Sequence, residues 1–213
     1  MSRATVVLVH GLWMNGMELA LLRRRIERCG FSARVFSYSS VGVSLAGNAE
    51  RLQHFVISLD TEVIHFVGHS LGGLVILQLF REYPHQRPGR IVLLGTPVTG
   101  SRVAARLGRN AFTRRLFGRS LDHGLLGNGP DWAGGRDLGI VAGTLSMGLG
   151  RWVTALPGPS DGTVALCETQ LAGATDRYTA PVTHMGLLFS ARVAAQVCAF
   201  LKTGRFGSNS DGF

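Results

Sequence analysis

At 213 residues, the chain is long enough for one well-packed core and short for two domains. Hydrophobic residues make up 46% of it and are spread along its length, which excludes a largely disordered chain. The formal charge of +9 rests on arginine, since Lys202 is the only lysine, and no apolar run approaches the ~20 residues of a membrane-spanning helix. We expect a single domain over residues 1–203 and a frayed tail at 204–213.

The three cysteines, Cys29, Cys167 and Cys198, stand far apart and form no C-x-x-C pair. An odd number at this spacing argues against a disulfide framework and against a zinc site. The first apolar run, residues 5–10, is too short and too soon followed by glycine to be the core of an export signal. The expected compartment is therefore a reducing cytoplasm.

The arginines gather in two clusters, one formed by Arg23, Arg24, Arg25 and Arg28 and the other by Arg102, Arg106, Arg109, Arg114, Arg115 and Arg119. Solvated helix faces explain both clusters most simply. The alternative is attraction to acidic substrates or to the anionic head groups of a membrane surface, as a peripheral contact. No nucleic-acid-binding motif is visible, so nucleic acid is not an expected partner.

Short apolar strands alternate with helical segments along the chain, which predicts a mostly parallel sheet with helices on both faces. Strands are expected at residues 5–9, 33–38, 63–67, 90–94, 138–142 and 177–182. Helices are expected at residues 16–29, 48–59, 74–82 and 190–203, with Asn48 as a cap. Residues 95–136 break the alternation, because they contain no strand pattern and mix apolar residues with arginines.

The pentapeptide Gly68-His69-Ser70-Leu71-Gly72 lies between an apolar strand and a helix. It matches G-x-S-x-G, in which a strained turn holds a serine hydroxyl above the end of a parallel sheet. Glycine two residues to either side of Ser70 avoids β-carbons that would crowd the turn. The pattern predicts a nucleophilic serine, although a glycine-rich turn after a strand can also be only a turn.

A serine nucleophile needs a base, and His184 follows the last expected strand at the edge where catalytic groups gather. The base in turn needs an orienting carboxylate. Asp161 lies in the loop after the strand at 138–142, and Ser70, Asp161 and His184 then follow the chain order expected with this turn. Glu168 is the reserve. The other acids considered precede their strands and belong at the wrong edge of the sheet: Asp60, Asp137 and Asp176.

Two backbone amides are expected to stabilise the oxyanion that forms when the serine attacks. One is the amide of Leu71, at the start of the helix after the serine, and the other is the amide of Leu12, in the loop after the first strand. His10 and His69 are expected to pack beside the site and to transfer no proton.

These motifs, together with Val9-His10-Gly11-Leu12, Gly95-Thr96-Pro97 and Asp161-Gly162-Thr163, resemble the α/β-hydrolase family and within it the small bacterial lipase- and esterase-like members. The resemblance spans residues 6 to about 206. It implies the α/β-hydrolase fold, with a short cap or lid formed by about residues 100–136. Similar lipases often carry a histidine where Val98 stands here, so the substrate class is not carried over.

The resulting prediction is a serine hydrolase that cleaves carboxylic esters, acyl or lipid esters in particular, through a covalent acyl-enzyme. The expected substrate-binding residues are Trp13, Phe112, Leu116 and Phe117, and no metal or organic cofactor is implied. The alternatives that remain open are a thioesterase or an acyltransferase with the same triad, a non-catalytic binding protein on a hydrolase scaffold and, as a less favoured reading, an amide-cleaving peptidase. The oligomeric state is not predicted.

Overall fold

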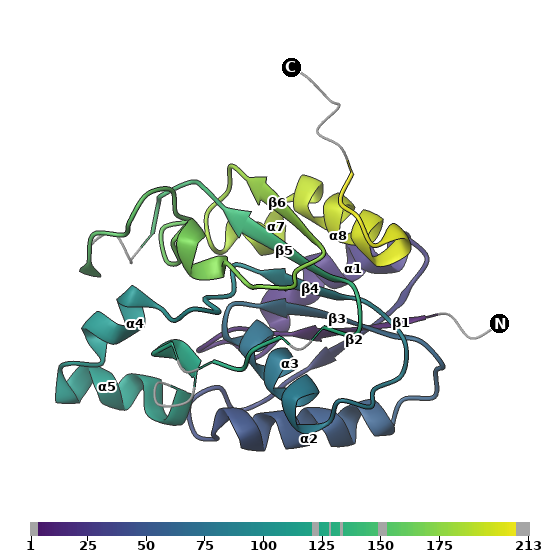
Figure 1. The fold of residues 1–213 in the computed structure, drawn as a ribbon, viewed down its shortest axis with the longest axis horizontal. Helices are drawn as coiled ribbons and strands as arrows, with labels where there is room; N and C mark the ends of the chain where they lie inside the picture. The colour runs from purple at the N-terminus through teal and green to yellow at the C-terminus, as the bar shows by residue number, and fades with distance from the viewer. Residues whose placement is uncertain (1–3, 121–123, 128, 133, 149–152, 208–213) are drawn as a thin grey trace.

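A six-stranded, all-parallel sheet forms the centre of the computed structural model, with the strand order β2-β1-β3-β4-β5-β6 (Figure 1). The structure describes residues 4–120, 124–127, 129–132, 134–148 and 153–207. The strands are β1 (Thr5–Val9), β2 (Ser32–Phe36), β3 (Ile64–His69), β4 (Ile91–Leu94), β5 (Leu138–Gly143) and β6 (Asp176–Ala180). Each strand predicted from the sequence is present, and the predicted fold class is confirmed.

Helices cover both faces of this sheet (Figure 1). One face is covered by α2 (Leu45–Ile57) and α3 (Leu71–Glu82), and the other by α1 (Ala20–Arg28), α7 (Gly186–Phe189) and α8 (Ala191–Thr203). Short 3-10 helices occur at η1 (Met17–Leu19) and η4 (Leu166–Thr169). None of the helices in the described ranges is both long and apolar enough to cross a membrane.

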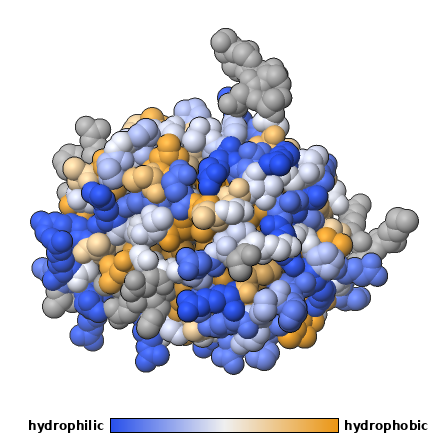
Figure 2. Space-filling model, in the orientation of Figure 1, coloured by the Kyte–Doolittle hydropathy of each residue, from blue (hydrophilic) through white to orange (hydrophobic). Residues whose placement is uncertain are grey.

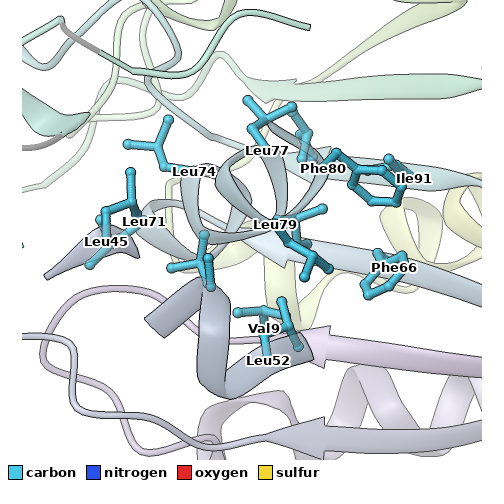
Figure 3. Packing of buried hydrophobic residues seen from close by; sticks show 14 of the residues in the cluster. Val9, Leu45, Leu52, Phe66, Leu71, Leu74, Leu77, Leu79, Phe80 and Ile91 are labelled. Carbon is cyan, nitrogen blue, oxygen red and sulfur yellow. The ribbon is translucent and has the colours of Figure 1, made fainter. Parts of the chain in front are cut away.

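The core forms two layers because successive strand residues point to opposite faces. In β1, Val7 and Val9 pack towards α2 and α3, whereas Val6 and Leu8 pack towards α1 and α8. The first layer is seen from close by in Figure 3, with Phe66 fully buried among side chains from β4 and α3. Truncating a buried phenylalanine of this kind typically costs about 3–5 kcal/mol.

The second strand-to-helix loop differs from the sequence prediction. Helix α2 begins at Leu45, and its cap is Ser44, whose Oγ accepts a hydrogen bond from the Gly47 amide at 3.1 Å. The prediction that Asn48 is the cap is wrong. Asn48 lies within α2, and its buried side chain donates to the carbonyls of Ser39 and Val43 in the preceding loop. Serine and asparagine are both common caps, and the path of the loop decides which of them caps the helix.

A disulfide joins Cys29, which follows α1, to Cys198 in α8, so the expectation of no disulfide is wrong. The two residues are 169 positions apart in the sequence, and they meet because α1 and α8 lie side by side on one face of the sheet. Cys167 remains a free, exposed thiol. Disulfides are rare in a reducing cytoplasm, so this bond does not fit the compartment expected from the sequence.

Between β4 and β5 the chain forms α4 (Arg102–Leu107), α5 (Ala111–Phe117) and η2 (Gly118–Ser120). We call residues 100–120 the cap segment. Figure 1 shows α4 and α5 beyond the carboxyl ends of the strands, at the left of the view. This edge is where ligands bind in open parallel sheets.

Candidate active site

Ser70 occupies the turn between β3 and α3, with φ 52° and ψ −122°, a conformation that L-residues rarely adopt. Its amide donates to the Leu94 carbonyl of β4 at 2.9 Å, which ties the turn to the sheet. A β-carbon on Gly68 would stand 2.6 Å from the Gly73 Cα, so the strand and the helix approach more closely than any larger residue allows. The local sequence therefore forces Ser70 to the tip of the turn.

His184 lies beside a buried carboxylate. Its Nδ1 is 2.6 Å from Oδ2 of Asp161, which is only 1% exposed. The other carboxylate oxygen, Oδ1, accepts from the amides of Thr163 and Val164, and the His184 amide donates to the Asp161 carbonyl. Because Nδ1–H donates to the carboxylate, the lone pair of the neutral imidazole is on Nε2, the nitrogen that a base would use.

Ser70 and His184 line the same cavity, which has a volume of about 440 Å3. Apolar side chains from three parts of the chain form most of its wall: Leu12, Trp13 and Met14 after β1, Val103, Ala104, Leu107, Phe117 and Leu125 after β4, and Val153, Val164 and Met185 near the acid and the base. The cavity thus places a serine on a strained turn and a histidine–carboxylate pair against a mostly apolar space.

A model of the alpha/beta hydrolase family matches residues 6–202. The chain belongs to the alpha/beta hydrolase family. The resemblance recognised in the sequence is confirmed by this match. A search among curated protein sequences finds no relative that matches.

Solved structures of other alpha/beta hydrolases are similar to this one. The lipase BlEst2 of Bacillus licheniformis in its mature form is 17% identical, with a TM-score of 0.73 over 95% of this chain and 92% of that one. The carboxylesterase CesB of Bacillus subtilis is 15% identical, with a TM-score of 0.59 over 95% and 84% of the two chains. The RedJ thioesterase of Streptomyces coelicolor is 14% identical, with a TM-score of 0.57 over 94% and 85%. At these identities the likeness shows the fold alone.

The loop after β1 lines the cavity of this alpha/beta hydrolase and has one amide that is not used within the described ranges. The Gly11 amide donates to the Met14 sulfur at 3.2 Å, and the Trp13 amide donates to Ser40 Oγ at 3.0 Å. The amide between them, that of Leu12, has no acceptor among the described residues. Leu71 directly follows Ser70 as the first residue of α3, where amides have no partner within the helix. Of the two predicted oxyanion donors, the Leu12 amide belongs to a residue that lines the cavity, and the Leu71 amide is next to Ser70 in the chain.

His10 holds this loop in place. Its Nδ1 donates to the Gly11 carbonyl at 2.9 Å, and its Nε2 accepts from the Tyr38 amide at 3.2 Å, so the ring is the neutral Nδ1–H tautomer. Burial lowers the pKa of His10, which agrees with a ring that stays uncharged. Both nitrogens are engaged with the backbone, so His10 has no free nitrogen for proton transfer.

The predicted substrate-binding residues fall in different places. Trp13 and Phe117 line the cavity, and their rings touch with centroids 5.1 Å apart. Phe112 is 77% exposed and lies outside the cavity lining, so the expectation that it binds substrate there needs correction. The side chain of Leu116 lies outside the described part of the chain.

The sequence prediction missed the contribution of α4 to the cavity. Val103, Ala104 and Leu107 line the cavity from one side of this helix, whereas Arg102 and Arg106 on the other side are exposed. The i, i+4 spacing of Val103 and Leu107 is a signal that could have identified this inner side.

Glu168, the reserve carboxylate, binds two backbone amides away from His184. Its Oε2 accepts from Ala165 and its Oε1 from Arg102, both at 2.8 Å. Arg102 is the first residue of α4, so the carboxylate joins the start of the cap segment to the loop that carries Asp161. Within the described ranges, no three His, Cys, Asp or Glu side chains are grouped to hold a metal ion.

Proposed function

We propose that this alpha/beta hydrolase cleaves carboxylic esters with apolar acyl groups, using Ser70 as nucleophile, His184 as base and Asp161 as the orienting acid. The observation that carries the proposal is the shared cavity. Ser70 on its strained turn and the His184–Asp161 pair open onto one apolar space of about 440 Å3. Acyl transfer by a serine needs a nucleophile, a base and an orienting acid at one site, and the shared cavity supports this assignment.

In the proposed reaction, the Ser70 oxygen attacks the ester carbonyl while His184 Nε2 takes the hydroxyl proton. The imidazolium that forms is stabilised by Asp161, whose carboxylate is already 2.6 Å from Nδ1. The amides of Leu12 and Leu71 donate to the oxyanion. His184 then protonates the leaving alcohol, and water attacks the acyl-enzyme by the same steps in reverse to release the acid.

The cavity wall supports a preference for medium or longer acyl chains. Its lining is mostly apolar, so an acyl chain leaves water as it enters. Each buried CH2 group contributes about 0.8 kcal/mol, or about fourfold in kcat/KM, until the cavity is filled. An acetyl group would leave most of this wall unused.

The first test is hydrolysis of p-nitrophenyl esters from acetyl to dodecanoyl. We expect kcat/KM to rise with chain length over the shorter members, and Ser70→Ala to abolish turnover. A fluorophosphonate should label Ser70, as located by mass spectrometry. A preference for acetyl over octanoyl would contradict the acyl-chain proposal, and the absence of both turnover and labelling would favour the non-catalytic binding protein.

A second pair of variants separates the two carboxylates. Asp161→Asn should lower kcat by roughly 10³–10⁴, because the amide cannot stabilise the imidazolium of His184. Glu168→Gln is the matched control, since Glu168 has its own backbone partners, and it should keep kcat within about tenfold of the wild type. A severe loss of kcat in Glu168→Gln but not in Asp161→Asn would overturn the assignment of Asp161 as the orienting acid.

Thioester hydrolysis and acyl transfer are the second candidate functions. Esters and thioesters present the same acyl side to Ser70 and to the cavity, and they differ only in the leaving group. A comparison of octanoyl-coenzyme A with p-nitrophenyl octanoate distinguishes them. A kcat/KM that is at least tenfold higher for the coenzyme A thioester would replace the ester in this proposal.

A further inference from the structure

One side of the cap segment points away from the cavity and is strongly basic. We call it the outer cap face and define it by exposed side chains from α4, α5 and the turns that follow them: Arg102, Arg106, Arg109, Phe112, Arg115 and Arg119. In Figure 2, hydrophilic side chains with a few hydrophobic ones between them occupy the left of the view, where Figure 1 shows α4 and α5. The inner side of α4 lines the cavity, so this short segment separates an apolar space from a cationic surface.

Within the described ranges, no carboxylate side chain is paired with the positive charge of the outer cap face. Residues 100–121 contain six arginines and no aspartate or glutamate. Among the described residues, no ion pair is found for the five arginines that define this face. Glu168 approaches the Arg102 backbone only, where its carboxylate binds the amide. The face therefore attracts anions in solution.

Exposed apolar side chains occur on the outer cap face and at the cavity beneath the cap segment. Phe112 is 77% exposed on the otherwise basic outer cap face. Trp13 is 57% exposed, lines the cavity and contacts Phe117 at the end of α5, so the cavity is continuous with the cap segment. Met185, beside His184, lines the cavity and is 37% exposed. Exposed aromatic residues among cations are typical of helices that lie in a lipid head-group layer.

We infer that the outer cap face docks onto an anionic lipid bilayer, with its arginines on the head groups, Phe112 inserted between them and the cavity mouth at Trp13 close to the membrane. The inference rests on the proposed function in one respect: docking would supply that reaction with acyl esters from the bilayer. Docking itself does not need catalysis. An acyl chain that leaves the bilayer next to Trp13 enters an apolar cavity with little exposure to water.

The expected strength of docking follows from the charges. Each arginine near an anionic surface strengthens binding by about fivefold at low salt, so the effects of five arginines multiply. This attraction is screened within ~10 Å at 0.1 M salt. A nucleic acid or an acidic protein would also bind the arginines, but neither accounts for exposed Phe112 and Trp13 beside an apolar cavity.

The test is co-sedimentation of the full chain carrying Ser70→Ala with vesicles, so that binding is measured without hydrolysis. Vesicles of phosphatidylcholine with 30% phosphatidylglycerol are compared with vesicles of phosphatidylcholine alone. We expect binding to the anionic vesicles only, weakened by 0.5 M sodium chloride. In the same background, Arg106→Gln/Arg109→Gln/Arg115→Gln should weaken binding by roughly 100-fold, and Phe112→Ser by several-fold.

The matched control is Arg24→Gln/Arg28→Gln/Arg34→Gln, which removes the same charge from exposed positions on α1 and β2. It should weaken binding less than fivefold, and thermal melting should show that both triple variants are folded. Equal losses from the two triple variants, or equal binding to both vesicle types, would overturn the inference. Tighter binding to a single-stranded DNA 20-mer than to anionic vesicles would overturn it in favour of nucleic acid. Loss of vesicle binding would leave the ester hydrolysis test unaffected, so the two proposals fail separately.

Discussion

His69 supports the proposed base through the backbone. Its side chain is 1% exposed, and its Nε2 lies 3.1 Å from the His184 carbonyl, so Nε2–H donates and Nδ1 carries the lone pair. Nδ1 is buried with no partner among the described residues. Burial holds the pKa of His69 well below its usual range, with a further contribution from His184. The ring is therefore neutral, and it does not oppose the charge that His184 gains in the proposed reaction.

Replacing His69 tests this positioning role. His69→Leu removes the donor to the His184 carbonyl, and we expect kcat to fall roughly 10- to 100-fold, because small displacements of a catalytic group are costly. KM should stay within about twofold. His69→Gln keeps an N–H at a similar reach and should recover most of kcat. Steady-state kinetics on p-nitrophenyl octanoate checks this. A wild-type kcat in His69→Leu would show that His69 does not position His184.

At the residue scale, chain order and strand ends restricted the sequence prediction to residues that the structure brings together. Asp161 and His184 each follow a strand, and the structure places their side chains in contact. The side chain of Phe112 could not be placed in the same way. In a helix as short as α5, two apolar residues five positions apart, Phe112 and Phe117, point to different sides, and the sequence does not say which side is inside.

At the element scale, the turn between β3 and α3 depends on close packing of glycines. The Gly68 position faces the backbone of Gly73 and the side chain of Ile76, and this contact holds the first turn of α3 against the end of β3. A shift of the Gly73 backbone would also move Ser70, because the Gly73 amide donates to the Ser70 carbonyl at 3.0 Å. The packing of β3 against α3 and the position of Ser70 thus depend on one contact.

Gly68→Ala should disturb both properties. The new β-carbon would lie 2.6 Å from the Gly73 Cα and 2.7 Å from its amide nitrogen. We expect a loss of stability of about 1–3 kcal/mol, and a kcat lower by roughly 100-fold because Ser70 moves. Gly207→Ala is the control, since its nearest neighbour is a Gln196 side-chain atom at 3.5 Å. Thermal melting and ester hydrolysis measure the two effects, and wild-type values for Gly68→Ala would show that the turn tolerates a β-carbon.

The elements of the sheet were predictable because buried parallel strands are continuous apolar runs, as in Ile91–Leu94 and Leu138–Gly143. Helix starts were less predictable, as Ser44 and Asn48 show. The pairing of Cys29 with Cys198 was not predictable at all, since it depends on which helices share a face of the sheet. Sequence spacing carries no information on that choice.

At the scale of the whole molecule, buried histidines make the fold sensitive to acid. His65 is 4% exposed, and its Nδ1 accepts from the Arg90 amide at 2.9 Å. Burial, together with Arg90 and Arg136, lowers the pKa of His65 to about 4. The unfolded chain takes up this proton near pH 6.5 and the folded chain only near 4, so the stability contributed by neutral His65 is present above pH 6.5 and is lost as the pH falls towards 4.

His65→Asn should reduce this loss, because the asparagine oxygen can accept from the Arg90 amide without titrating. Urea unfolding of the wild type should show stability falling by up to about 3 kcal/mol between pH 6.5 and 4 from His65 alone. The variant should show a shallower slope, with the remainder due to groups such as His10 and His69. His85→Asn, at an exposed position, is the control and should leave the slope unchanged. If the free energy of unfolding of His65→Asn fell as steeply with pH as that of the wild type, the attribution of this loss to His65 would be contradicted.

The disulfide is the second whole-molecule determinant of stability. Breaking a cross-link that closes a long loop commonly costs about 2–4 kcal/mol. For a chain of this size the melting temperature of Cys198→Ser should therefore fall by roughly 5–15 °C. Dithiothreitol should lower the melting temperature of the wild type by a similar amount and leave that of the variant unchanged. Cys167→Ser is the control, and an unchanged melting temperature in Cys198→Ser would show that the bond is not formed.

The same bond determines how the molecule responds when it is pulled by its two ends. In the oxidised chain only residues 1–29 and 198–213 can be drawn out, roughly 150 Å in all, whereas the reduced chain can extend to roughly 700 Å. Ser70, Asp161 and His184 all lie within the covalent loop. Mechanical tension applied at the termini therefore passes through Cys29 and Cys198: it reaches β1 and the loop that carries Leu12, but not the covalent loop that holds Ser70, Asp161 and His184. A single-molecule force-extension curve would record this as a short rip that lengthens on reduction.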